Sequence, residues 1–163
     1  MRDEEHYGKL LAAANKIKDE IYGNRLVLFA PLYAANFCSN NCLYCAFRTG
    51  NKYITRTSLS TEDIAQETRA ILEQGHKRIL LLTGEHSEKS RLDSLIKAIE
   101  TIYSVRDSKG NGIRRINVEI APLSDENFRE LSKLKIGTYT VFQETYHRET
   151  YKKVHLGGPK SDF

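Results

Sequence analysis

The order of apolar and polar positions predicts a helix, then a strand, then a long polar segment at the start of the chain. Apolar residues recur at helical spacing through residues 1–22, which predicts an amphipathic helix. Residues 25–34 form an almost continuous apolar run with β-propensity, which is typical of a buried strand. The polar segment that follows, residues 36–58, contains every cysteine of the chain.

Helical and strand patterns alternate through the rest of the chain. Ser60, with Asp63 three residues later, resembles a capping box, and Gly75 is a typical residue for a helix end. In chain order we expect a helix over 60–74, a strand over 78–83, a helix over 90–105, a surface loop over 107–112, a strand over 113–121, a helix begun by Ser124 and ending near 135, a strand over 137–142, and a short helical turn through 154.

Strands that alternate with helices predict an α/β fold with a parallel sheet. The pattern contains about four parallel βα units after the N-terminal helix, which are too few to close a barrel. Right-handed crossovers place the carboxyl ends of the strands together, where such sheets bind ligands. The polar motifs of the sequence follow strands, so we expect them to gather at that edge.

Composition and charge exclude several classes of protein. The 163 residues fit one domain, and 40% hydrophobic with 28% charged residues is ordinary for a globular protein. The net charge of +4 is spread among acidic residues and forms no basic stripe, which argues against nucleic acid. No apolar run approaches the roughly 20 residues of a membrane span. The charged first 22 residues do not resemble a signal peptide, so we expect a cytoplasmic protein.

The three cysteines indicate a metal centre. Cys38, Cys42 and Cys45 form a tight, odd-numbered set that is a poor disulfide framework. Three thiolates can hold a four-iron cubane, which then has one iron without a protein ligand, because the chain has no other cysteine. A zinc site with three cysteines would need a nearby histidine, and the next one, His76, lies beyond a predicted helix.

The loop Cys38-Ser-Asn-Asn-Cys42-Leu-Tyr-Cys45 resembles the signature of the radical S-adenosylmethionine (SAM) superfamily. The resemblance implies a partial radical SAM barrel, a 4Fe–4S cluster on the three cysteines, and SAM bound to the open iron. Electron transfer into SAM then yields a 5′-deoxyadenosyl radical that abstracts hydrogen from substrate. Tyr44 occupies the aromatic position that lies against the adenine in this family, although an aromatic there can also serve only for packing.

Two strand ends carry further candidate cofactor contacts. Thr83, Gly84 and Glu85 resemble the family's GGE-like motif, which holds the SAM amino group, although any strand-ending turn can look the same. Glu119 interrupts an apolar strand and alternates with Val118. We expect it to face the interior of the barrel and accept from the SAM ribose or amino group, the alternative being a surface carboxylate.

A dense polar cluster follows the last predicted strand. Gln143, Glu144, Tyr146 and His147 are shared with the tyrosine lyases of the superfamily and are candidates to face substrate. Tyr146 and His147 can equally cap and pack the following turn. The stretch from His155 to Lys160 resembles the family's HPxGPK-like segment, and we assign it no chemical role.

The segments GHKRILLLTGEH, IRRINVEIAPLSDENFRELSKLKIGTY and VFQETYHRETYKKVHLGGPKSDF extend the resemblance to the tyrosine lyases over most of the chain. These enzymes cleave the Cα–Cβ bond of L-tyrosine to dehydroglycine and p-cresol. IRRINV and GTYTVFQETYHRETY are closer to the maturase of FeFe-hydrogenase, which supplies carbon monoxide and cyanide. TGEH and Glu119 are closer to 2-iminoacetate synthase of thiamine biosynthesis. We favour the maturase and keep 2-iminoacetate synthase as the alternative.

We therefore expect a helix over 1–22 and the N-terminal part of a radical SAM core over 23–163, with the barrel incomplete. The resemblance implies L-tyrosine as substrate and reduced flavodoxin or ferredoxin as electron donor. Since the families are longer, we expect this chain alone to hold the cluster but to cleave tyrosine poorly. A non-catalytic iron–sulfur or zinc-binding module is the further alternative, and the oligomeric state is not predicted.

Overall fold

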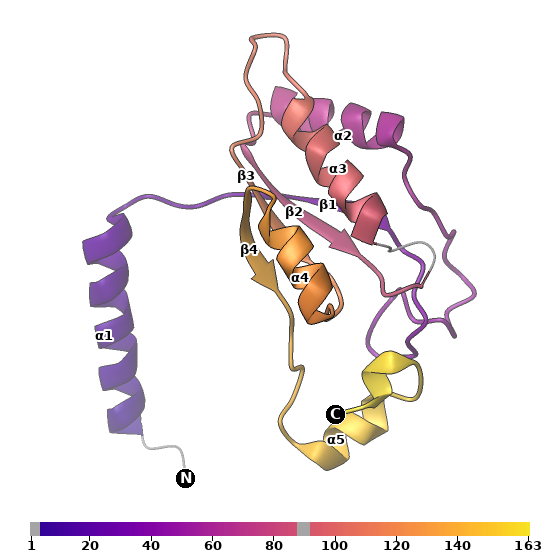
Figure 1. The fold of residues 1–163 in the computed structure, drawn as a ribbon. Coiled ribbons are helices and arrows are strands. Elements are labelled where there is room, and N and C mark those ends of the chain that lie inside the picture. Colours follow the sequence, from indigo (N-terminus) through magenta and orange to yellow (C-terminus); the bar gives the residue numbers. More distant parts are fainter. Residues whose placement is uncertain (1–3, 88–91) are drawn as a thin grey trace.

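The computed structural model describes residues 4–87 and 92–163. The ends of two predicted helices, 1–3 and 90–91, lie outside the described residues. The elements are α1 Glu4–Tyr22, β1 Ala30–Ala35, α2 Thr61–Glu73, β2 Arg78–Thr83, α3 Leu92–Ser104, β3 Arg115–Glu119, α4 Asp125–Ser132, β4 Ile136–Thr140, α5 Arg148–Val154 and the 3-10 turn η1 Pro159–Ser161 (Figure 1).

The strands form one sheet in the order β1-β2-β3-β4, and every neighbouring pair is parallel. The fold class predicted from the alternating pattern, four parallel βα units after an N-terminal helix, is therefore confirmed. Because all the strands point the same way, their carboxyl ends share one edge of the sheet. The loop after β1, the turn after β2 and the segment after β4 all leave from that edge.

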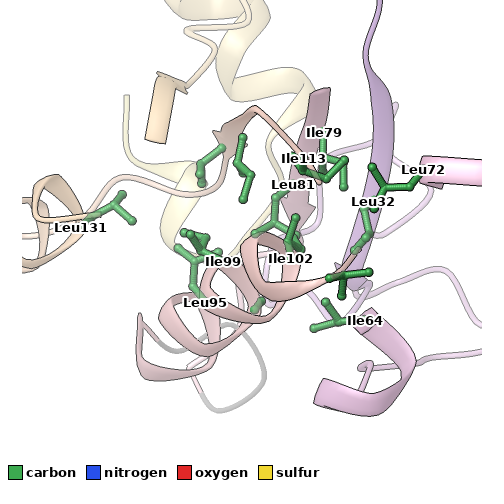
Figure 2. Close-up of a cluster of buried hydrophobic side chains, with 14 residues drawn as sticks. Leu32, Ile64, Leu72, Ile79, Leu81, Leu95, Ile99, Ile102, Ile113 and Leu131 are labelled. Atoms are coloured by element: carbon green, nitrogen blue, oxygen red, sulfur yellow. The ribbon is translucent and has the colours of Figure 1, made fainter. Parts of the chain in front are cut away.

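The hydrophobic core lies between the sheet and helices α2, α3 and α4. Alternate strand residues face these helices, among them Leu32, Leu81 and Val118, and each is almost fully buried. They belong to one cluster with apolar residues of the helices such as Ile64, Ile99 and Leu131, and Figure 2 shows Leu32 and Leu81 beside the helices. Because successive side chains of a strand point to opposite faces, the remaining strand residues lie on the other face of the sheet.

The predicted strand over 25–34 is wrong at its start and in its burial. Residues 25–29 are not in a strand, and Leu26 is 82% exposed. The cause is the length of the neighbouring strand. Ala30 pairs with Ile79, and β2 begins only one residue before that, so the preceding apolar residues have no strand beside them. Within β1, Tyr33 is 52% exposed, so only one face of this strand is buried.

The helix-boundary signals act as predicted. Ser60 and Asp63 form a complete capping box at the start of α2, each accepting from the other's backbone N–H. Gly75 follows the helix with φ of 93°, a conformation that glycine adopts without steric cost. Ser124 caps α4 by accepting from the backbone of Asn127. These local contacts fix where α2 and α4 begin.

Helix α1 stands apart from the sheet in Figure 1. It has the amphipathic pattern expected from the sequence, but none of its residues is buried. A membrane-spanning helix would need a longer apolar stretch than any helix within residues 4–87 and 92–163 provides.

Candidate cluster and cofactor site

The loop after β1 carries the three cysteines, and all three thiols are free. Cys42 is buried, and Cys38 and Cys45 are half-buried. Burial raises the pKa of Cys42, and the neighbouring thiols of Cys45 and Cys38 raise it further, whereas the charge of Lys160 and the nearby hydroxyl of Tyr44 lower it. All three thiols belong to one loop of eight residues, 38–45.

Three thiols on one loop are the donor set that iron–sulfur clusters take from proteins. Among the described residues, no three His, Cys, Asp or Glu side chains stand close enough to hold a single metal ion. With its three free thiols, the loop fits the predicted cluster in the chemistry of its donors.

The end of β2 holds this loop in place. The backbone N–H of Ser39 donates to the carbonyl oxygen of Glu85 over 2.6 Å. Asn40, which is 3% exposed, donates from Nδ2 to Oε2 of Glu85 over 2.6 Å. The predicted strand-end motif and the cysteine loop are thus joined by both main chain and side chain.

Gly84 is required by the close approach of these two segments. A Cβ atom at Gly84 would lie 2.3 Å from the carbonyl oxygen of Phe37 and 3.2 Å from Cβ of Cys38. Real Cβ atoms do not approach a backbone oxygen so closely, so any side chain here would push the loop away. The glycine of the motif therefore has a steric reason that is visible in the structure.

Arg56 organises the second half of the loop. Its guanidinium donates to the backbone carbonyls of Asn36, Phe47, Arg48 and Asn51, over 2.6 to 3.2 Å. Sequence reasoning missed this residue, because an arginine in a polar segment carries no signal of which carbonyls it will bind.

The segment after α5 pairs with the cysteine loop from the other side. Leu43 N–H donates to the carbonyl of Val154 over 2.9 Å, and Asn41 N–H donates to that of Gly157 over 2.9 Å. The backbone of Lys160 donates to Oδ1 of Asn40 over 2.8 Å. Asn40 therefore joins the loop to both the end of β2 and the C-terminal segment.

Tyr44 and His155 face each other across this pairing. The hydroxyl of Tyr44 lies 2.7 Å from Nε2 of His155, and the two rings pack edge to face with centroids 5.5 Å apart. Tyr44 is 54% exposed, whereas His155 is 3% exposed. Burial raises the pKa of Tyr44, and the carboxylate of Glu144 raises it further, so the hydroxyl keeps its proton.

Carboxylates from two other strand ends lie near these residues. Glu119 is on the sheet face opposite its neighbour Val118, as alternation predicted, and away from the helices. Burial raises the pKa of Glu119, the charge of Glu144 adds to this effect, and Lys160 opposes it. Glu144 itself forms an ion pair with Lys160 and has a φ of 68°, which is unusual for a residue with a side chain.

The remaining candidates lie differently. Gln143 is exposed, and Tyr146 is 85% exposed. His147 is the N-cap of α5, where its Nδ1 accepts from the backbone N–H of Thr150 over 3.2 Å. Of the two readings left open for His147, the structure therefore shows the capping contact, and it directs Tyr146 to solvent.

An open cavity of about 670 Å³ lies beside the loop at the carboxyl ends of β2 and β3. Its lining includes Ser39, Gly84, Glu85, Ile120 and Pro159. The cavity thus borders the cysteine loop, the strand-end motif and the C-terminal segment.

Comparison with known proteins gives concordant matches. Residues 32–163 match the model of the radical SAM superfamily. The FeFe-hydrogenase maturase HydG from Carboxydothermus hydrogenoformans is 53% identical, with a TM-score of 0.82 over 92% of this chain and 34% of that one. Another HydG crystal structure is 44% identical, with a TM-score of 0.89 over 99% of this chain and 36% of that one.

Among curated proteins, 2-iminoacetate synthase of Escherichia coli (strain K12) is 36% identical over 155 residues, which is 95% of this chain and 39% of the relative. The chain thus spans between a third and two fifths of the length of these three relatives.

Proposed function

Because the chain belongs to the radical SAM superfamily, we propose that it is the cluster- and SAM-binding part of a tyrosine lyase of the HydG kind. The superfamily's cofactors are a 4Fe–4S cluster and SAM, and the enzyme class is that of radical SAM enzymes. The observation that carries the finer proposal is the identity of 44 to 53% to two HydG structures over nearly the whole chain.

In this proposal Cys38, Cys42 and Cys45 hold the cluster. When cluster and SAM are bound, they supply reductive cleavage of SAM and with it the radical that starts the reaction. The protein's own contribution is to place these groups and to keep water away from them. The grouping of the three free thiols and the hydrogen bonds that hold their loop support this assignment.

The strand ends then orient SAM. Thr83, Gly84 and Glu85 are proposed to receive its amino group, since a carboxylate is a strong acceptor for an ammonium group. Only Oε2 of Glu85 bonds to Asn40, so its other carboxyl oxygen can accept from SAM. Glu119 is proposed to accept from the ribose or amino group, and Tyr44 to contact the adenine.

The substrate side is proposed to involve Gln143 and Glu144. Glu144 is held by Lys160 in a backbone conformation that costs free energy, and such strain is found where a side chain must be aimed at a ligand. The reaction proposed for the whole protein is cleavage of the Cα–Cβ bond of L-tyrosine to dehydroglycine and p-cresol. Reduced flavodoxin or ferredoxin would supply the electron.

The second candidate is 2-iminoacetate synthase, favoured by 36% identity across 95% of the chain. It would use the same residues on the same substrate. The two functions differ in the products that they release. Incubated with L-tyrosine, SAM and a reductant, the whole protein should form p-cresol in either case, and release of carbon monoxide should occur only if it is the maturase. Absence of p-cresol would contradict both candidates.

The 163 residues are tested for the cofactor chemistry itself. Purified chain is reconstituted with iron and sulfide without oxygen, reduced, and examined by electron paramagnetic resonance (EPR) before and after SAM is added. A cluster signal that changes with SAM supports the proposal. A colourless chain that holds one zinc ion, or a cluster whose signal ignores SAM, supports a non-catalytic binding module instead.

A further inference from the structure

His155 belongs to a segment to which the sequence assigned no chemical role, yet it lies at the centre of the contacts around Tyr44. Its backbone pairs with Cys42 in an isolated antiparallel bridge. The bridge is flanked by hydrogen bonds from Leu43 N–H to Val154 and from Leu156 N–H to Asn41, over 2.9 and 3.3 Å. His155 is therefore fixed to the cysteine loop through its main chain on both sides.

The side chain of His155 is fixed as well. Nδ1 lies 2.9 Å from the carbonyl oxygen of Tyr151, and the imidazole stacks on the Tyr151 ring with centroids 3.8 Å apart. A carbonyl oxygen only accepts, so Nδ1 carries the hydrogen. In the neutral imidazole Nε2 is then an acceptor, and the hydroxyl of Tyr44, 2.7 Å away, donates to it.

This bond determines how Tyr44 is presented. With more than half of its surface exposed, the ring would otherwise be free to adopt several staggered rotamers. The bond to a buried and doubly held histidine restricts it to one orientation and turns the hydroxyl toward α5.

We propose that His155 is a positioning residue that fixes the ring of Tyr44 for SAM by accepting the hydrogen bond of its hydroxyl. The inference rests on the proposed function, in which Tyr44 contacts the adenine. It concerns a residue that acts through Tyr44 and does not touch the cofactor.

A set of matched variants tests the inference. Tyr44→Phe removes the hydroxyl and keeps the ring. His155→Asn keeps a donor near the position of Nδ1 but removes the acceptor for Tyr44, whereas His155→Gln can place an amide oxygen near the position of Nε2. Tyr53→Phe, at a tyrosine that is 99% exposed, is the control. Because Tyr44 is exposed, its variant should fold even where a substitution at the buried histidine does not.

The main measurement is the dissociation constant for SAM of the reconstituted chain, with the EPR change on SAM addition as the spectroscopic signature. Tyr44→Phe and His155→Asn should each weaken SAM binding about three- to tenfold, the range expected for one hydrogen bond, at unchanged iron content. The double variant should bind no worse than either single one, and His155→Gln should recover part of the loss. Tyr53→Phe should match the wild type.

A second measurement needs no cofactor. In the ¹⁵N NMR spectrum of the cluster-free chain, Tyr44→Phe should shift the Nε2 resonance of His155 and leave the protonated Nδ1 in place. Unchanged SAM binding in Tyr44→Phe, or losses that simply add in the double variant, would overturn the inference while the proposed function stands. A wild-type cluster that ignores SAM would overturn the proposed function and this inference with it.

Discussion

Asn40 donates a hydrogen bond to Glu85 over 2.6 Å, although 45 residues separate them in the chain. The same side chain accepts from the backbone of Lys160 over 2.8 Å. Through one buried amide, the cysteine loop is therefore connected with the end of β2 and with the C-terminal segment.

Asn40→Asp should destabilise the cluster-free chain in a pH-dependent way. The aspartate loses the donor and places a second carboxylate against Glu85, at a cost of about 2 kcal/mol. The shared site raises the pKa of the pair in the folded state, so stability should be higher in acid and fall as the pH rises above about 4, the ordinary pKa of these carboxyls. Thermal denaturation at several pH values measures this. Asn40→Ala is the control, with a loss that does not depend on pH; an equally flat profile for the aspartate would contradict the prediction.

Replacing any one of Cys38, Cys42 and Cys45 with serine should abolish stable cluster binding. In the proposed function each thiolate is one of three protein ligands, and a serine hydroxyl is a poor substitute for soft iron–sulfur coordination. Iron and sulfide analysis after reconstitution should fall from about four irons per chain to a small fraction of that. A variant that keeps full iron content and the SAM-dependent EPR change would remove that cysteine from the ligand set.

Gly84→Ala should lower both stability and cluster loading. The added methyl would meet the carbonyl of Phe37 at 2.3 Å, and overpacking of this kind costs about 1–3 kcal/mol. Gly157→Ala is the matched control, because nothing lies within 4 Å of a Cβ there. Urea denaturation and iron content of the two variants should therefore differ, and similar values would show that the loop yields freely.

Arg56→Lys should loosen the second half of the cysteine loop despite keeping the charge. A lysine cannot reproduce the planar fork that reaches four carbonyls, and we expect a loss of about 2 kcal/mol. In a chain of this length the melting temperature should fall by about 4–8 °C. Lys52→Arg, at an exposed position of the same loop, should leave it unchanged.

Glu119→Gln should stabilise the cluster-free chain slightly at neutral pH. Burial and the charge of Glu144 raise the pKa of Glu119 above its ordinary value of 4.5. Between pH 4.5 and the raised pKa of the folded state, the folded chain therefore holds more protons than the unfolded chain. Its stability falls as the pH rises through that window. Glutamine removes the penalty. The two melting temperatures should coincide in acid and separate at pH 7, and a lower value for the glutamine variant at pH 7 would contradict the assignment.

The sequence predicted those features that depend on neighbouring residues. Apolar residues that recur with helix spacing in some segments and with strand spacing in others predicted four parallel strands. Ser60 and Asp63 marked the start of α2, because a capping box is completed within one turn. The start of β1 was wrong because it depends on where β2 begins. The apolar pattern of residues 25–29 carries no information about where β2 begins.

The candidate site also combines features that neighbouring residues determine with contacts that distant segments determine. The spacing of the cysteines and the glycine of the strand-end motif could be recognised directly. The contact of Tyr44 with His155 spans 111 positions, and the four carbonyls that Arg56 binds belong to an irregular loop. Neither follows from periodicity, because each depends on how distant segments meet at the edge of the sheet.

The pairing of residues 41–43 with residues 154–157 also sets an order of events during synthesis. The three cysteines leave the ribosome more than a hundred residues before the segment that pairs with their loop. Until that late segment emerges, the loop lacks the backbone hydrogen bonds that join it to residues 154–157. A cluster loaded after translation has passed residue 157 would therefore meet a loop that is already paired.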